Sequence, residues 1–83
     1  MIKEDELKKG DRIKFKYYSN IDPYPVCIGT VDHVYGIGYI TALLGKSFFQ
    51  IDVIIDEVLN NHWYKDLVGR KVRIRNDFDI EIL

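Results

Sequence analysis

Hydrophobic and polar side chains alternate along most of this chain with a period of two, which is typical of β-strands. The clearest run, "RIKFKYY" at residues 12–18, places Ile13 and Phe15 on one face and cations on the other. Similar runs predict three further strands, at residues 26–35, 36–44 and 48–55. The alternation changes phase at Gly29, and a glycine inside a strand indicates a bulge or a sharp bend.

Three segments depart from this strand pattern. Residues 1–9 are mostly charged and are expected to form a frayed arm or a single helical turn. Residues 19–25, "SNIDPYP", form a proline-bearing loop, because proline cannot donate to a strand ladder. The apolar spacing then widens to four, which predicts a short helix or 3-10 segment near 57–67 with Asp56 as its N-cap.

The last alternating run, "KVRIRNDFDIEI" at residues 71–82, has cations in its first half and acids in its second half. It is either one continuous strand or a hairpin with a three-residue loop at 75–77. The hairpin would oppose Val72 with Ile80, Ile74 with Phe78, Arg73 with Asp79 and Lys71 with Glu81. All of these pairs are compatible, so the hairpin is the favoured alternative.

The composition agrees with a β-rich chain. Twelve isoleucines and seven valines stand against one alanine, and β-branched side chains pack well on a pleated surface. A chain of 83 residues predicts a single domain over residues 1–83. Five or six short strands in this length predict a mainly-β fold, a small antiparallel barrel, because closure removes exposed strand edges.

The order of these segments resembles that of the SH3-like small barrels, which include Tudor-like and KOW-like modules. The residues that match are the Gly10-Asp11 pair before the first strand and the Gly29-Thr30-Val31 step within the second. The resemblance implies an SH3-like barrel and a role as a binding module. It assigns no site residue, because one fold can host many functions.

Charge and cysteine content narrow the classes of partner. The formal net charge is −1 and the pI is near 6.1, so no overall field steers the protein towards nucleic acid. A single cysteine, Cys27, predicts no internal disulfide and fits a reducing compartment. No window reaches the ~18 apolar residues of a membrane span, so we expect a cytoplasmic protein without a membrane partner.

Catalytic and cofactor motifs are incomplete. "LLGKS" and "YGIGY" each lack a glycine that a phosphate-binding or dinucleotide-binding loop requires. The two histidines and Cys27 do not have the spacing of a zinc site. We therefore expect no enzyme activity, no cofactor, no metal and no small-molecule substrate. An enzyme using His62 with Asp56 or Glu57 is the least favoured interpretation.

Aromatic side chains supply the leading prediction, which is recognition of another protein. Tyrosine and tryptophan offer large, rigid contact surfaces with a polar tip. Tyr17 and Trp63 fall on inward positions, where a small core would use them. The other candidates lie at loops or phase breaks. The predicted protein-binding residues are Tyr18, Tyr24, Trp63 and Tyr64.

Basic side chains supply the alternative, which is binding of nucleic acid or a nucleoprotein. The candidate residues are Arg12, Lys14, Lys16, Lys71, Arg73 and Arg75. If the first strand paired with the last, these cations would form one stripe suited to a phosphate backbone. The competing interpretation is a solvated face on which acids balance the cations. The negative net charge and the hairpin pairing place nucleic acid second.

Overall fold

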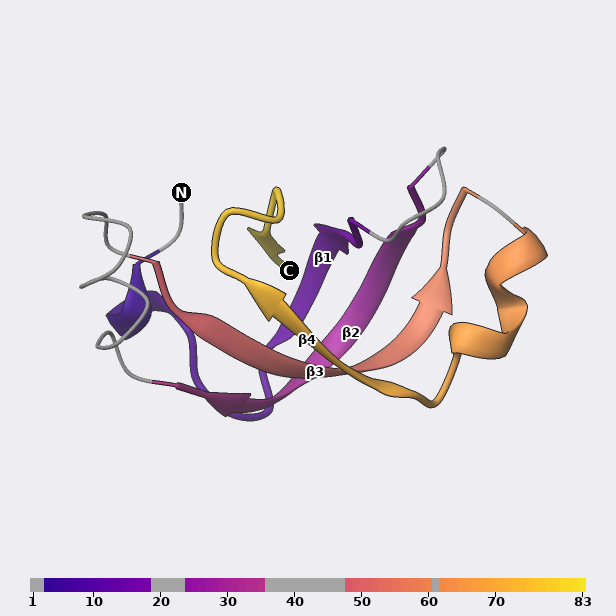
Figure 1. The fold of residues 1–83 in the computed structure, drawn as a ribbon. Helices are drawn as coiled ribbons and strands as arrows, with labels where there is room; N and C mark the ends of the chain where they lie inside the picture. Colours follow the sequence, from indigo (N-terminus) through magenta and orange to yellow (C-terminus); the bar gives the residue numbers. More distant parts are fainter. Residues whose placement is uncertain (1–2, 19–23, 36–47, 61) are drawn as a thin grey trace.

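A single antiparallel sheet of five strands, in the order β4-β3-β2-β1-β5, organises the described part of the chain (Figure 1). The computed structural model describes residues 3–18, 24–35, 48–60 and 62–83, with residues 4 and 62–64 described by their backbone alone. The strands are β1 (Arg12–Lys16), β2 (Val26–Val34), β3 (Gln50–Val58), β4 (Lys71–Arg75) and β5 (Glu81–Ile82). The two 3-10 helices are η1 (Glu4–Glu6) and η2 (His62–Leu67). The predicted mainly-β class is confirmed.

The core lies against one face of this sheet, and the alternation in the sequence selects that face. Ile13 and Phe15 of β1 are fully buried, whereas the cations between them lie on the opposite face. The other buried apolar residues are Leu7, Cys27, Val31, Phe49, Ile51, Val53, Ile55 and Ile74. Burying a side chain of this size stabilises the fold by about 1.5–3 kcal/mol. Tyr17 packs against this cluster, as predicted.

Gly29 lies where β2 pairs with β3, and the register between the two strands shifts at this residue. A Cβ at position 29 would press on the Val53 side chain and lie 2.8 Å from the Ile54 carbonyl oxygen. Only glycine therefore permits the two strands to approach this closely. The predicted irregularity at Gly29 is confirmed.

β3 continues further than its sequence pattern indicated. Glu57 pairs with Ile28 and Val58 pairs with Cys27, so the ladder with β2 holds residues 56–58 in strand conformation. Asp56 is consequently a strand residue, and its prediction as a helix N-cap is wrong. The 3-10 segment η2 forms within the predicted range but begins only at His62 (Figure 1).

Three further predictions concern the N-terminal residues, the turn into β1 and the strand at residues 36–44. η1 is the single helical turn that was one alternative for residues 1–9, and Leu7, just after it, is anchored in the core. Lys9-Gly10 forms the turn into β1, and Gly10 has a φ of 95°. The strand predicted at 36–44 lies outside the described residues.

The C-terminal run neither pairs with itself nor continues as one strand. β4 pairs with β3, whereas β5 pairs with β1 through Ile82 opposite Ile13. The favoured hairpin is therefore wrong, although the chain does turn near its predicted loop.

Asn76 fixes that turn and is almost fully buried. Its backbone N–H donates to the Phe49 carbonyl (3.1 Å), and its Oδ1 accepts from the Phe49 N–H (3.2 Å). The turn carries the chain from one edge of the sheet to the other. Within the described residues no ladder joins β4 to β5, so the sheet does not close into a barrel.

Candidate functional site

The six predicted nucleic-acid-binding cations divide into two separate groups. Arg12, Lys14 and Lys16 belong to β1, whereas Lys71, Arg73 and Arg75 belong to β4. β2 and β3 lie between these strands in the sheet. The strand that pairs with β1 on its second side is β5, which contributes the acid Glu81 opposite Lys14. The fold therefore does not join the six cations into one stripe.

Acids on the same polar face compensate most of these cations. The ion pairs are Arg12–Asp56 (3.7 Å), Lys71–Asp32 (3.7 Å), Arg73–Asp52 (3.0 Å) and Arg75–Asp77 (2.9 Å). Within the part of the chain that the structure describes, Lys14 and Lys16 have no ion pair. The predicted alternative of a balanced, solvated face thus describes four of the six positions.

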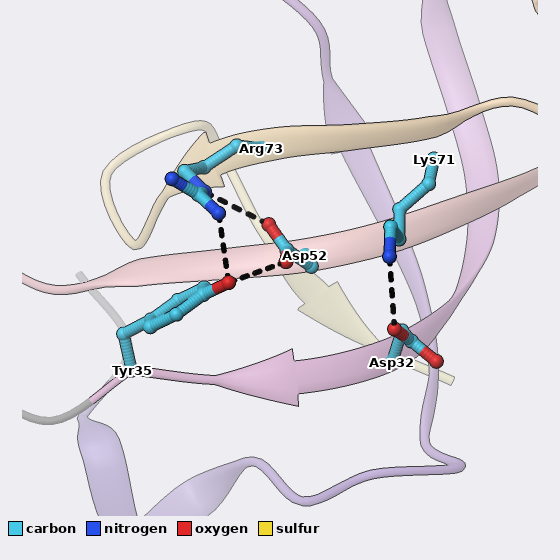
Figure 2. A network of polar contacts seen from close by, with 5 residues as sticks. All are labelled: Asp32, Tyr35, Asp52, Lys71 and Arg73. Atoms are coloured by element: carbon cyan, nitrogen blue, oxygen red, sulfur yellow. Dashed lines mark hydrogen bonds and ion pairs between the residues drawn. The ribbon is translucent and has the colours of Figure 1, made fainter.

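The most ordered of these contacts is a three-residue network across β4, β3 and the end of β2 (Figure 2). Arg73 Nε donates to Asp52 Oδ1 (3.0 Å), and the Tyr35 hydroxyl donates to Asp52 Oδ2 (2.6 Å). A second guanidinium N–H of Arg73 donates to the Tyr35 hydroxyl (2.7 Å). The three side chains therefore complete a closed ring of hydrogen bonds.

The hydrogen bonds of this network shift the pKa values of its three side chains. The hydrogen bond from Arg73 lowers the pKa of Asp52, and the hydrogen bond to Asp52 raises the pKa of Tyr35. The same pairing with Asp52 raises the pKa of Arg73. Asp52 is only 7% exposed, so an unpaired carboxylate there would be costly. The network fixes β4 on the sheet.

A second constellation is aromatic and lies where the chain leaves β1 and enters β2. The ring of Tyr18 lies 5.0 Å from that of Tyr24 and 5.1 Å from that of Phe78, the latter in an edge-on arrangement. Both tyrosines are predicted protein-binding residues, and Tyr18 remains 40% exposed. Sequence reasoning missed Phe78, because it was assigned to the inner face of the wrong hairpin.

Tyr18 is held in place by the turn after β4. Its hydroxyl donates to Asp79 Oδ2 (2.7 Å), and this hydrogen bond raises the pKa of Tyr18. Asp79 itself has a positive φ of 50°, a conformation that aspartate tolerates better than most residues. The turn therefore presents its carboxylate to the tyrosine.

Tyr24 is positioned by an asparagine at the end of β3. Asn60 Oδ1 accepts from the Val26 N–H (2.7 Å), and Asn60 Nδ2 donates to the Tyr24 carbonyl (3.2 Å). Pro25, between these residues, is fully buried. The role of Asn60 in placing Tyr24 depends on a contact 36 positions away, so it could not be predicted from the local sequence.

An open pocket of about 620 Å³ is lined by Tyr18, Arg75, Asp77 and Phe78, and Tyr24 packs against Tyr18 beside this lining. The Lys16 N–H donates to the Phe78 carbonyl (3.0 Å), which docks the turn on β1. Arg75 donates through Nε and a terminal N–H to the two carboxylate oxygens of Asp77 (3.0 and 2.9 Å). The pocket thus has aromatic walls and a neutralised ion pair.

Cations also contact the aromatic rings of this region. Lys16 Nζ lies 5.4 Å from the ring centre of Tyr18 and 5.7 Å from that of Tyr24. The guanidinium of Arg75 lies 6.0 Å from the ring of Phe78. Such contacts favour a cation over the ring face. Two predicted nucleic-acid-binding residues and two predicted protein-binding residues therefore meet at one site.

The other predicted site residues lie elsewhere. Trp63 and Tyr64 belong to η2, and their side chains lie outside the described residues, as does that of His62. Asp56, one of its suggested catalytic partners, accepts a hydrogen bond from the Thr30 hydroxyl (2.8 Å). Glu57 is exposed on β3. The structure thus does not assemble these residues into a described site.

Cys27 is fully buried, and burial raises the pKa of its thiol to about 11. At neutral pH the thiol is therefore protonated and unreactive. Among the described residues, no group of three or more His, Cys, Asp or Glu side chains is arranged to hold a metal ion. No helix in the described ranges is both long enough and apolar enough to cross a membrane.

The chain was compared with protein-family models, with curated proteins and with solved structures, and none of them matches. Its function must therefore be inferred from the geometry of its own residues.

Proposed function

We propose that this protein is a non-enzymatic binding module that recognises another protein through the pocket beside Tyr18, Tyr24 and Phe78. The observation that carries this proposal is an open pocket lined by the rings of Tyr18 and Phe78, with Tyr24 packed against Tyr18, where the sequence predicted exposed tyrosines. Aromatic side chains with polar tips are the residues that most often anchor protein interfaces.

The rigidity of the pocket supports this proposal. Separate hydrogen bonds fix its parts: Asp79 holds the Tyr18 hydroxyl, Asn60 holds the backbone of Tyr24, and Lys16 holds that of Phe78. Preorganised walls reduce the conformational entropy that a partner must remove on binding. These hydrogen bonds come from three different segments of the chain, and together they hold the parts of the pocket in fixed positions.

The binding site extends to η2, and the protein is an SH3-like module located in the cytoplasm. Trp63 and Tyr64 remain candidate contacts, because η2 begins two residues after Asn60, which positions Tyr24. The five-stranded antiparallel sheet is compatible with the resemblance to SH3-like binding modules. A cytoplasmic location fits the buried, unpaired thiol of Cys27.

Affinity capture with matched variants tests this function. The tagged protein is incubated with a lysate of its source cells, beside the variants Tyr18→Ala, Tyr24→Ala and Val68→Ala. Val68 is an exposed apolar side chain outside the pocket lining. We expect one partner to be retained by the wild type and by Val68→Ala, and to be lost at least tenfold from both tyrosine variants.

Circular dichroism and thermal unfolding of each variant must show that the fold is kept. Equal retention of the same partner by folded Tyr18→Ala, Tyr24→Ala and wild-type protein would contradict the proposed function. Loss from the folded Val68→Ala variant, with retention by both tyrosine variants, would place the interface elsewhere.

Nucleic-acid binding is the second candidate, supported by Lys14 and Lys16, which have no ion pair among the described residues, and by the tyrosines beside Lys16. A phosphate contact would give affinity that falls steeply with salt. Fluorescence anisotropy of a labelled single-stranded oligonucleotide at low salt tests it. We expect no binding; binding that weakens on Lys14→Ala and Lys16→Ala would favour this candidate instead.

A further inference from the structure

Among the described strands, β4 forms an edge of the sheet. β4 pairs with β3 on one side, and within the described residues no strand pairs with its other side. β1, by contrast, lies between β2 and β5. An open edge leaves a row of backbone N–H and C=O groups without a ladder partner, and another extended chain can use them.

The register identifies which backbone groups face outwards. The Asn76 N–H donates to the Phe49 carbonyl, and the Ile55 N–H donates to the Arg70 carbonyl (2.9 Å). Antiparallel ladders alternate between hydrogen-bonded and non-hydrogen-bonded pairs. The hydrogen-bonded pairs between these two bonds are then Ile51 with Ile74 and Val53 with Val72.

The residues between them therefore direct their backbone groups away from β3. Lys71 and Arg73 each present an N–H and a C=O to the open edge, and Arg75 presents an N–H, since its carbonyl accepts from Phe78. The spacing of these groups matches that of one additional strand of about five residues.

The side chains on this edge exclude a second copy of β4 as the occupant. Two β4 strands paired antiparallel about Arg73 would place Arg73 opposite Arg73 and Lys71 opposite Arg75 on one face. Like charges directly opposite each other destabilise a strand pair. The edge is thus protected against self-association by its own charge.

The same charge favours a different occupant. We propose that the β4 edge binds an extended partner segment in which acidic residues alternate with apolar ones. Its acids would lie beside Lys71 and Arg73, and its apolar residues would extend the face of Val72 and Ile74. Cross-strand pairs of opposite charge and of apolar side chains stabilise such a register.

Arg73 keeps capacity for this contact. A guanidinium has five N–H donors, and its contacts with Asp52 and Tyr35 use two of its nitrogens (Figure 2). Among the described residues, Lys71 forms one ion pair, with Asp32 at 3.7 Å, and 58% of its side chain is exposed. Both cations can therefore contact a partner carboxylate without leaving the sheet.

A peptide with defined charge tests this inference. The probe is a labelled seven-residue peptide that alternates glutamate with valine. The controls are the same peptide with lysine for glutamate, and the glutamate peptide with every second backbone nitrogen methylated. We expect the first to bind at low salt, the lysine peptide not to bind, and the methylated peptide to bind at least tenfold more weakly.

Two matched variants locate the site. Lys71 and Arg12 have similarly exposed side chains and equally long ion pairs, but Arg12 lies on β1, which is paired on both sides. We expect Lys71→Gln to weaken peptide binding about threefold and Arg12→Gln to leave it unchanged. In ¹⁵N spectra of the complex, exchange of the Lys71 and Arg73 amides should slow.

Several results would overturn the inference. Absence of binding by the glutamate peptide at low salt would do so, as would equal affinity for the methylated peptide, which cannot complete a ladder. Loss of binding on Tyr18→Ala in the folded protein would move the peptide to the aromatic pocket. The two sites share Arg75, but Lys71 and Arg73 lie outside the pocket lining, so Lys71→Gln and Tyr18→Ala separate failure of one proposal from failure of the other.

Discussion

Tyr18 and Asp79 are 61 positions apart in the chain, and the tyrosine hydroxyl donates a 2.7 Å hydrogen bond to the aspartate carboxylate. This contact joins the residues that follow β1 to the turn that follows β4. It fixes one wall of the aromatic pocket against the turn that supplies Phe78. The geometry of the pocket therefore depends on where the C-terminal segment is docked.

Replacing Asp79 should release Tyr18. The hydrogen bond to Asp79 is the main cause of the raised pKa of Tyr18, so Asp79→Ala should lower that pKa towards its usual value of 10.0. In the wild type the bond is present below the raised pKa and is lost as pH rises through it. A ¹³C NMR titration of the Tyr18 ring measures this. Asp79→Asn, which keeps an acceptor and tolerates positive φ, should shift the pKa less. An unchanged pKa in Asp79→Ala would refute the coupling.

Gly29→Ala should destabilise the protein by about 1–3 kcal/mol, because the added methyl group is too large for the space between the paired strands β2 and β3. The closest contact is with the Val53 side chain, so the loss should be smaller in a Val53→Ala background, although the contact with the Ile54 carbonyl oxygen remains. Urea unfolding measures both values. Gly10→Ala is the control: its position has a positive φ but open space, so Val53→Ala should not change its effect. Additive effects at Gly29 and Val53 would contradict this explanation.

Two asparagines make similar hydrogen bonds in different surroundings. Asn76 accepts from the Phe49 N–H where it is buried, whereas Asn60 accepts from the Val26 N–H where it is exposed. Asn76→Ala removes the buried acceptor and should reduce the free energy of unfolding by about 1–3 kcal/mol, because no water replaces the lost hydrogen bond. Asn60→Ala should have a smaller effect on thermal unfolding. Equal losses would show that burial does not decide the difference.

Asp52 should make the protein sensitive to acid. Because Arg73 lowers its pKa in the folded state, the stabilisation from this carboxylate is present above the unfolded pKa of about 4. It is lost as the pH falls through the lower, folded-state pKa. The difference in urea midpoint between wild type and Asp52→Asn should therefore be large at pH 6 and shrink below pH 4. Asp56→Asn, which breaks a longer and more exposed ion pair, should change the midpoint less. A difference that does not depend on pH would contradict the pairing.

The strands and the bulge could be predicted because their signals are local. Ile13 and Phe15 alternate with cations whatever their partners are, and Gly29 interrupts the same local pattern. The length of β3 could not be predicted in this way. Its last residues are held by pairing with β2, some thirty residues earlier in the chain.

The predicted hairpin of the C-terminal run is wrong for an energetic reason. Each exposed ion pair of the expected hairpin would contribute only a few tenths of a kcal/mol. The observed arrangement instead buries Asn76 with two hydrogen bonds to Phe49 and places Ile82 beside Ile13. Contacts between distant segments outweigh a charge pattern within one segment.

Only some residues of the aromatic site could be predicted from the sequence. Tyr18 and Tyr24 were candidates because they lie where the strand pattern breaks. Phe78 and Asn60 have no local signal, since their roles arise from contacts with residues more than thirty positions away. The ion pair of Arg12 with Asp56 was hidden for the same reason.

Site-specific photo-crosslinking tests the central claim, that a partner binds at the aromatic pocket. A benzophenone amino acid is placed at position 24, where the native ring packs against Tyr18 of the pocket, or at Leu59, an exposed apolar position outside the pocket lining. Irradiation in the lysate should give an adduct of the captured partner from position 24 and none from position 59. An adduct from position 59 alone, with the partner still captured, would contradict the claim.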